Sequence, residues 1–155
     1  MLEIERKFLI KSENYKTKIG SSCDIIQGYL SIDPERAVRV RLCGEIGAIT
    51  VKGPSSENGL SRLEWEKEIS VDDAKTLLGL CLPHKIEKIR HFVDFMGHTF
   101  EIDEFTGKNT GLVLAEIELK SENETFKKPD WLGVEVTGNP RYYNSYLSQN
   151  PYESW

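Results

Sequence analysis

Charged and apolar residues alternate along the opening segment Leu2–Ile10, where Glu3, Glu5 and Lys7 occupy every second position. Because successive side chains of a β-strand point to opposite faces, these three groups would share one face of a strand. A single charged face is usually solvated and carries weak cross-strand ion pairs. The pattern becomes restrictive only if several strands repeat it, because their charged faces must then share a common side of the sheet.

The alternation does recur along the chain. Residues 37–42, 48–52, 62–69, 86–95, 98–105 and 112–120 repeat it, and residues 25–32 and 133–137 are further expected strands. Pro, Gly and Asn residues between these segments mark hairpin turns and loops. About eight strands connected mainly by hairpins predict an antiparallel meander, which can stay open or close into a barrel. The charged residues fall on the same face of strand after strand, which favours closure around a water-filled tunnel.

Short helices are expected between the strands. Residues 12–20 and 70–79 each begin with a serine N-cap, Ser121–Glu124 has the form of a capping box, and Asn139 with Pro140 would start a C-terminal helix. The helices are expected to cover the apolar outer face. The tyrosine-rich C-terminal helix either packs on the barrel or plugs one tunnel mouth. The expected fold class is α+β: one domain, residues 1–155, with an eight-stranded antiparallel β-barrel, helices on its outside and a C-terminal helix.

Composition narrows the class of protein. With 39% hydrophobic and 29% charged residues in 155, the chain is expected to be globular rather than disordered. No apolar run approaches the roughly 20 residues that cross a bilayer. The chain begins directly on a charged strand, so no signal peptide and a cytoplasmic location are predicted. Cys23, Cys43 and Cys81 lack C-x-x-C spacing, which predicts reduced thiols and no zinc site. The net charge of −5 argues against a nucleic-acid partner.

The shared charged face contains residues of both signs. Its cations are Lys7, Arg39, Arg41, Lys52, Arg62, Lys88 and Arg90; its anions are Glu3, Glu5, Glu64, Glu66, Glu101, Asp103, Glu116 and Glu118. Inside a tunnel such groups would be costly without a ligand that organises them, because unpaired buried charge is unfavourable. Arginine and lysine suit phosphate oxygens, whereas paired carboxylates suit a hard divalent cation. The ligand that this face predicts is therefore a metal-bound polyphosphate.

The segments that carry these residues resemble the CYTH superfamily, also called triphosphate tunnel metalloenzymes. Glu3-Ile4-Glu5-Arg6-Lys7 has the E-x-E-x-K form of that family's signature. Residues 38–41, 50–53, 62–66, 88–90, 100–103, 115–118 and 131–138 extend the resemblance, in order, over nearly the whole chain. The chain looks most like the short bacterial members, which tend to be tripolyphosphatases. It departs from some longer members at Gly28–Pro34, where they carry an aromatic-Asp motif, and this weakens a cyclase or thiamine triphosphatase assignment.

The resemblance implies metal-dependent hydrolysis of inorganic tripolyphosphate in an eight-stranded tunnel, with one or two Mg²⁺ or Mn²⁺ ions. The expected phosphate-binding residues are Lys7, Arg39, Arg41, Lys52, Arg62, Lys88 and Arg90. The expected metal ligands are Glu3, Glu5, Glu64, Glu66, Asp103, Glu116 and Glu118, and the expected catalytic residues are Glu5, Lys7 and Glu116. A small-molecule triphosphate is the expected partner, with no nucleic acid and no membrane, for a monomer or homodimer.

Three alternatives stay open at this point. The first is another enzyme of the same superfamily: an adenylyl cyclase, or a nucleoside or thiamine triphosphatase, since all of these present the same triphosphate to the tunnel. The second is a non-catalytic protein that senses or stores polyphosphate. The third is a plain β-barrel interaction module whose charged face is solvated.

Overall fold

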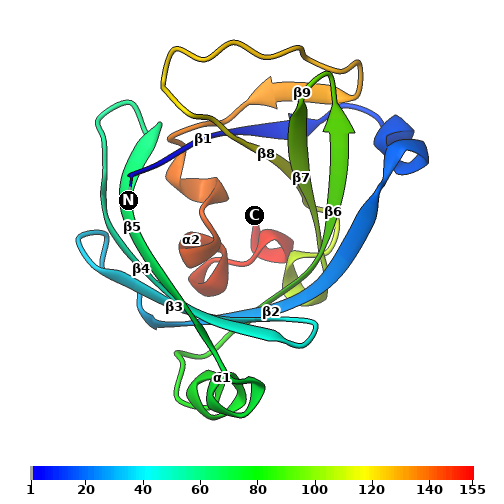
Figure 1. Ribbon diagram of the computed structural model, residues 1–155. Helices are drawn as coiled ribbons and strands as arrows, with labels where there is room; N and C mark the ends of the chain where they lie inside the picture. Colours follow the sequence, from blue (N-terminus) through cyan, green and yellow to red (C-terminus); the bar gives the residue numbers. More distant parts are fainter. Residues whose placement is uncertain (1) are drawn as a thin grey trace.

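The computed structural model describes residues 2–155 and shows a closed antiparallel β-barrel (Figure 1). The strands are β1 (Leu2–Ile10), β2 (Ser21–Ser31), β3 (Ala37–Cys43), β4 (Ile46–Ser55), β5 (Ser61–Ile69), β6 (Ile86–Phe95), β7 (His98–Phe105), β8 (Val113–Glu118) and β9 (Leu132–Glu135). The helices are α1 (Val71–Leu78) and α2 (Asn144–Gln149), with 3₁₀ turns at Glu13–Lys18, Gly107–Asn109, Pro140–Tyr142 and Tyr152–Ser154.

Strand β1 closes the barrel. The sheet runs in the order β5-β4-β3-β2-β6-β7-β8-β1-β9, and β1 also pairs with β5. Within β1, residues 2–4 pair with β5, residues 5–9 pair with β8, and the end of the strand pairs with β9. Eight strands therefore form the ring, as predicted, and β9 is added beside β1. Because the barrel is closed, every second side chain of each strand points into an enclosed interior.

The outward face carries most of the apolar core, on two sides of the barrel. On one side Phe8, Phe100, Ile102 and Ile117 are buried beneath Trp131, whose ring lies 5.3 Å from that of Phe100. On the other side α1 packs Ala74 and Leu78 against Val40 of β3. Ser70 caps α1 by accepting a hydrogen bond from the Asp73 N–H, as its sequence predicted. Among residues 2–155, no helix is both long and apolar enough to cross a bilayer.

Helix α2 is not on the outside of the barrel. Viewed along the barrel axis, it lies within the ring of strands (Figure 1). Its buried Leu147 belongs to an apolar cluster with Ile86, Phe105, Leu112 and Leu114 from β6, β7 and the start of β8. Strand alternation places Ile86 and Leu114 on the same inward side as Lys88 and Glu116. The interior therefore has an apolar end sealed by α2 and a charged part beyond it. Two roles were considered for the C-terminal helix, packing on the barrel or plugging one tunnel mouth. Its position inside the ring is that of a plug.

Two local predictions were wrong. Residues 119–131 contain no helix. The chain makes a turn at Ser121–Glu124, where the Glu124 carboxylate accepts from the Lys120 N–H, and then continues without regular structure to Phe126, which packs against Phe8 and Phe100. Glu124 accepts from the Lys120 N–H instead of the Ser121 N–H that a capping box uses, and tertiary packing of the Phe126 ring holds the segment outside a helix. This packing outweighs the weak local preference for a short helix.

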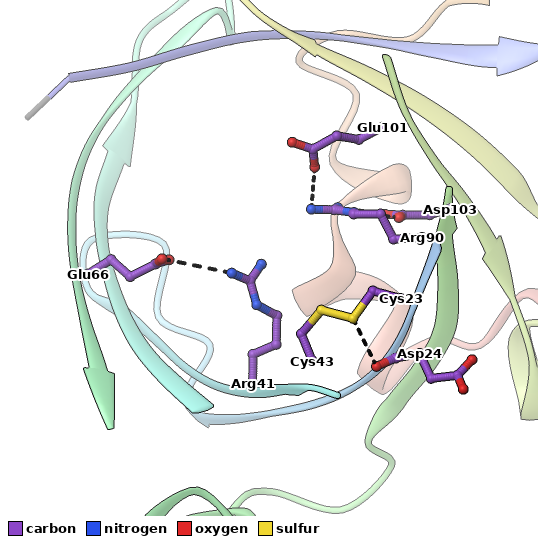
Figure 2. The surroundings of a disulfide bond; sticks show 8 residues. All are labelled: Cys23, Asp24, Arg41, Cys43, Glu66, Arg90, Glu101 and Asp103. Carbon is purple, nitrogen blue, oxygen red and sulfur yellow. Dashed lines mark hydrogen bonds and ion pairs between the residues drawn. A yellow bond between two sulfur atoms is a disulfide. The ribbon is translucent and has the colours of Figure 1, made fainter. Parts of the chain in front are cut away.

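The prediction of three reduced thiols was also wrong. Cys23 of β2 and Cys43 of β3 form a disulfide with a Cα–Cα distance of 6.1 Å, and Cys81 alone is free. The pair lies in the barrel wall beside Arg41 and Arg90 (Figure 2). The spacing of the cysteines in the sequence did not reveal this pairing. It depends on the register of β2 on β3, which sets Ile25 opposite Cys43 and so places Cys23, two residues along β2 on the same face, diagonally beside Cys43.

The sealed end should be important for stability. Replacing Leu147 by Ala removes a side chain that is 1% exposed and leaves a cavity among Ile86, Phe105 and Leu114. We expect the free energy of unfolding to fall by about 2–5 kcal/mol in urea denaturation. The control V134A, at a side chain that is 69% exposed, should change it by less than about 0.5 kcal/mol. Equal stability of the two variants would show that α2 does not seal the barrel.

Candidate active site

The charged part of the barrel interior is a cavity of about 320 Å³. All seven cations of the predicted charged face line it, and so do all of its anions except Asp103. The remaining lining residues are Tyr29, Ala37, Thr50, Ser55, Gly59, Leu60, Tyr143, Asn144 and Ser145. Residues from β1 through β8 and from α2 therefore meet around one space. The inward face is a common chamber rather than a set of solvated surface pairs.

Carboxylates crowd together where β1, β8 and β5 meet. Glu5 lies opposite Glu118 in the register of β1 on β8, and Lys7 lies opposite Glu116. Burial and the neighbouring carboxylates of Glu116 and Glu3 raise the pKa of Glu5 well above its ordinary value. Among residues 2–155, neither Glu5 nor Glu118 has an ion-pair partner within 4.0 Å, while Glu116 lies 3.8 Å from the Lys7 ammonium and 3.9 Å from the Arg90 guanidinium. This part of the chamber holds more negative charge than its own cations neutralise.

A second pair of carboxylates lies next to this group. Lys52 Nζ is 2.8 Å from Glu3 and 3.3 Å from Glu64. Burial, together with a hydrogen bond to Glu3, raises the pKa of Glu64 to about 7. Although burial opposes it, that same hydrogen bond and the Lys52 ammonium lower the pKa of Glu3 to about 2. The proton that this pair holds therefore lies on Glu64, and Glu3 is the ionised partner.

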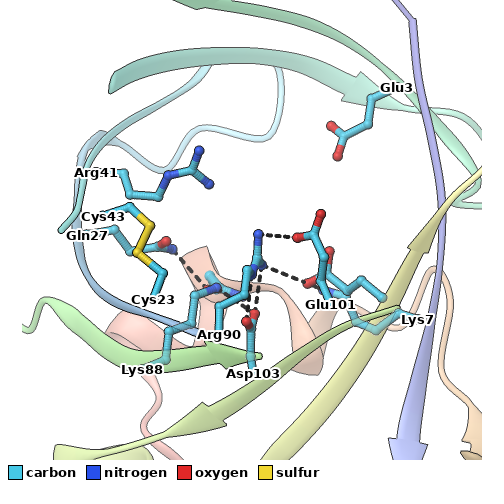
Figure 3. A network of polar contacts seen from close by, with 12 residues as sticks. Glu3, Lys7, Cys23, Gln27, Arg41, Cys43, Lys88, Arg90, Glu101 and Asp103 are labelled. Atoms are coloured by element: carbon cyan, nitrogen blue, oxygen red, sulfur yellow. Dashed lines mark hydrogen bonds and ion pairs between the residues drawn. A yellow bond between two sulfur atoms is a disulfide. The ribbon is translucent and has the colours of Figure 1, made fainter. Parts of the chain in front are cut away.

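Arginines crowd together on the opposite wall. Figure 3 shows Arg41 on one side of the chamber, with Glu3 and Glu101 pointing inward from the other side. Burial and the neighbouring guanidinium groups of Arg39 and Arg90 lower the pKa of Arg41. Glu66 is the nearest counter-charge, but its oxygens lie 3.8 Å from both Arg39 and Arg41. This wall carries positive charge that the protein neutralises only in part, which is the condition of an anion-binding site.

Asp103 lies behind the cavity wall instead of lining it. It is 0% exposed, and its two carboxylate oxygens accept hydrogen bonds of 2.7–2.8 Å from Arg90 and Lys88. Despite burial, these two cations lower the pKa of Asp103. Burial in turn lowers the pKa of Lys88 to about 8. Arg90 also pairs with Glu101 (Figure 3). Asp103 thus fixes two cations at the cavity wall, and its oxygens are already occupied.

The carboxylates fit a hard divalent cation by their chemistry. Glu3, Glu5, Glu64, Glu116 and Glu118 offer oxygen donors to one cavity, and the raised pKa of Glu5 and of Glu64 shows that a cation would be favourable there. In the described part of the chain no three His, Cys, Asp or Glu side chains are already gathered at metal-binding distances. Mg²⁺ is usually held by one or two carboxylates together with water and phosphate oxygens, so such a site is completed by its substrate.

Sequence reasoning missed several lining residues. Tyr29 and Thr50 follow the inward alternation of β2 and β4, so that periodicity could have identified them. Tyr143, Asn144 and Ser145 could not have been found in this way, because they follow a non-strand turn and enter the barrel from one end. The only signal for them was the possibility that the C-terminal helix plugs a tunnel mouth.

The Glu64 pKa predicts a pH dependence of stability. Because folding raises this pKa from 4.5 to about 7, Glu64 contributes stability below pH 4.5 that is lost as the pH rises through 7. The lowered pKa of Glu3 acts in the opposite sense, and its contribution is lost only as the pH falls toward 2. In chelator, the melting temperature of the wild type should therefore fall more steeply between pH 5 and 8 than that of E64Q, whose amide can still donate to Glu3. E122Q, which changes an exposed acid, should retain the wild-type slope.

Comparison with known proteins assigns the chain to a family. The CYTH domain matches residues 1–145. An inorganic triphosphatase of Acetivibrio thermocellus is 50% identical over 154 residues, which cover 99% of this chain and 97% of that protein. An inorganic triphosphatase of Nitrosomonas europaea is 36% identical over 152 residues, covering 96% and 97% of the two chains. The crystal structure of the inorganic triphosphatase NE1496 has a TM-score of 0.65 at 33% identity and covers 94% of this chain and 93% of its own. This chain belongs to the CYTH family.

Proposed function

We propose that the protein is an inorganic triphosphatase that hydrolyses tripolyphosphate with the help of Mg²⁺ or Mn²⁺. The observation that carries this proposal is that one cavity holds both signs of incompletely paired charge. Glu5 and Glu64, whose pKa values are raised, lie on one side, and Arg41, whose pKa is lowered beside Arg39 and Arg90, lies on the other. A polyphosphate bound to a divalent cation neutralises both sides at once. Two inorganic triphosphatases that are 50% and 36% identical over almost the whole chain support the choice of substrate.

The cationic groups of the cavity would bind and orient the phosphates. In this proposal Arg39, Arg41 and Arg90 contact them from the arginine-rich wall, and Lys7, Lys52, Arg62 and Lys88 complete the set. Their role is positioning and charge neutralisation, because phosphoryl transfer needs little covalent chemistry from the protein. A water attacks the terminal phosphorus and the bond to the bridging oxygen breaks, giving orthophosphate and pyrophosphate. The arginines offset the charge that develops on the leaving pyrophosphate.

The acidic groups would hold the metal. Glu5, Glu116 and Glu118 meet across β1 and β8, and Glu3 and Glu64 lie beside them. A bound divalent cation supplies neutralisation of phosphate charge and orientation of the attacking water. Glu5 and Glu116 are also our candidates for accepting the proton of that water, and Lys7 orients Glu116. Glu66 could serve the metal or align Arg39 and Arg41. For Asp103 we propose alignment of Lys88 and Arg90 in place of metal binding, because its oxygens are already occupied.

The cavity is built within one chain. Its described lining residues come from β1 through β8 and from α2, so we propose that residues 1–155 act as a single domain and that a monomer is sufficient for activity. The third reading of the sequence, an interaction module with a solvated charged face, does not agree with the enclosed position of these groups.

A substrate panel tests the proposal directly. The purified protein, with Mg²⁺, with Mn²⁺ or with chelator, is given tripolyphosphate, ATP or thiamine triphosphate, while phosphate and cyclic AMP are measured. We expect metal-dependent phosphate release, fastest from tripolyphosphate, and no cyclic AMP. Cyclic AMP from ATP, or faster hydrolysis of ATP or thiamine triphosphate, would favour another enzyme of this superfamily. Tight tripolyphosphate binding without turnover would make the protein a non-catalytic binder.

The metal role rests most heavily on Glu5. E5Q removes a carboxylate charge while keeping its size, so hydrolysis with Mg²⁺ should fall by about 100-fold or more. The fold should be preserved, since E5Q relieves the repulsion among Glu5, Glu3 and Glu116 and should raise the melting temperature in chelator. The matched control E122Q changes an exposed acid outside the cavity and should keep wild-type activity. Wild-type turnover by E5Q would refute the metal role.

A further inference from the structure

The C-terminal segment contacts both lysines at the sealed end of the cavity. Lys7 Nζ donates to the Tyr142 carbonyl at 3.1 Å, and the Tyr143 ring centre lies 5.4 Å from the same nitrogen. Lys88 Nζ donates to Asn144 Oδ1 at 2.8 Å. Tyr143, Asn144 and Ser145 also line the cavity. The segment that closes the barrel is thus in contact with groups that bind substrate in our proposal.

Lys88 shows why this contact is more than packing. Its side chain is 2% exposed, and an ammonium group has three N–H donors and no acceptor. One donor goes to Asp103 Oδ2 at 2.8 Å and one to Asn144 Oδ1 at 2.8 Å. One N–H is left for a phosphate oxygen in the cavity that Lys88 lines. Two acceptors fix the direction of the third donor, whereas Asp103 alone would leave the ammonium free to rotate and to shift toward the carboxylate.

The hydrogen bonds also settle the orientation of the Asn144 amide. Because an ammonium can only donate, the atom facing Lys88 must be the Asn144 oxygen. The same oxygen accepts a second bond, of 2.9 Å, from Gln27 Nε2 of β2. Gln27 is 0% exposed, and among residues 2–155 its own Oε1 has no hydrogen-bond partner. A buried carbonyl without a partner is costly. Gln27 therefore donates to Asn144 in an orientation that leaves its own Oε1 without a hydrogen bond.

We propose that Asn144 is a positioning residue of the active site, which acts by holding the Lys88 ammonium toward the bound phosphate, with Gln27 fixing the amide in turn. This inference rests on the proposed function of the cavity. It makes α2 a working part of the site: the first residue of the helix orients a cation, while Leu147, one turn on, packs into the apolar end.

A double-mutant cycle between Asn144 and Lys88 tests the proposal. We expect N144A to lower kcat/KM for tripolyphosphate with Mg²⁺ by about 10- to 100-fold, the range for losing a hydrogen bond to a charged group. K88M should cost as much or more. In the K88M background N144A should then cost less than about twofold, because its effect passes through Lys88. N150A, at the other end of the same helix and away from the cavity lining, should keep wild-type kcat/KM.

A second readout does not depend on turnover. By calorimetry in chelator, N144A should weaken tripolyphosphate binding in the wild-type background and not in the K88M background. Failure of the wild type to hydrolyse tripolyphosphate would contradict the proposed function, while this binding cycle would still test the positioning role. If N144A does not fold, Q27M replaces it in the same cycle, with an expected loss of several-fold. Full activity of N144A, or an equal loss in both Lys88 backgrounds, would overturn the proposal.

Discussion

The interior of this barrel depends on the buried contact of Asp103 with Lys88 and Arg90. All three side chains are largely withdrawn from water, and Asp103 uses both oxygens to hold the two cations. Removing one member of such a group would leave uncompensated charge in a low-dielectric setting, which is strongly destabilising. The contact therefore anchors the cationic wall from behind. It holds Lys88 and Arg90 at the cavity wall, where Arg90 also pairs with Glu101.

From that anchor the inward positions separate into two regions. Toward one end they are apolar, with Ile86, Phe105 and Leu114 closed by Leu147; beyond them they are charged. The apolar end is a packed core, so it supplies the burial energy that the charged region cannot. It also removes water from one end of the cavity, which strengthens the electrostatic interactions near Lys7 and Lys88. Stability and function thus occupy successive parts of the same strands.

Sequence periodicity could predict the charged face because each inward residue is fixed by strand alternation alone. Glu5, Arg41 and Glu116 lie where it put them. Periodicity could not distinguish Asp103 from Glu101, because both lie on the inward face of β7. Only the three-dimensional packing shows that Asp103 is buried behind Lys88 and Arg90, while Glu101 lines the cavity. The Cys23–Cys43 disulfide depends on strand register, and Asn144 depends on how a chain end folds back into the ring. These features are set by tertiary packing, which a local pattern does not encode.

Without a ligand, the buried charges of the cavity are held at an unfavourable free energy, and a ligand that neutralises them would bind more tightly for that reason. Burial makes Glu5 and Glu64 less acidic than free carboxyls and Arg41 less basic than a free guanidinium, and neighbouring groups of the same sign add to each of these pKa shifts. A ligand that satisfies both walls recovers this free energy when it binds and stabilises the fold by mass action. Stabilisation by phosphate alone or by metal alone would relieve only one wall. In the function that we propose, the cavity is therefore suited to the complex of metal and polyphosphate, and each should bind more tightly when the other is present.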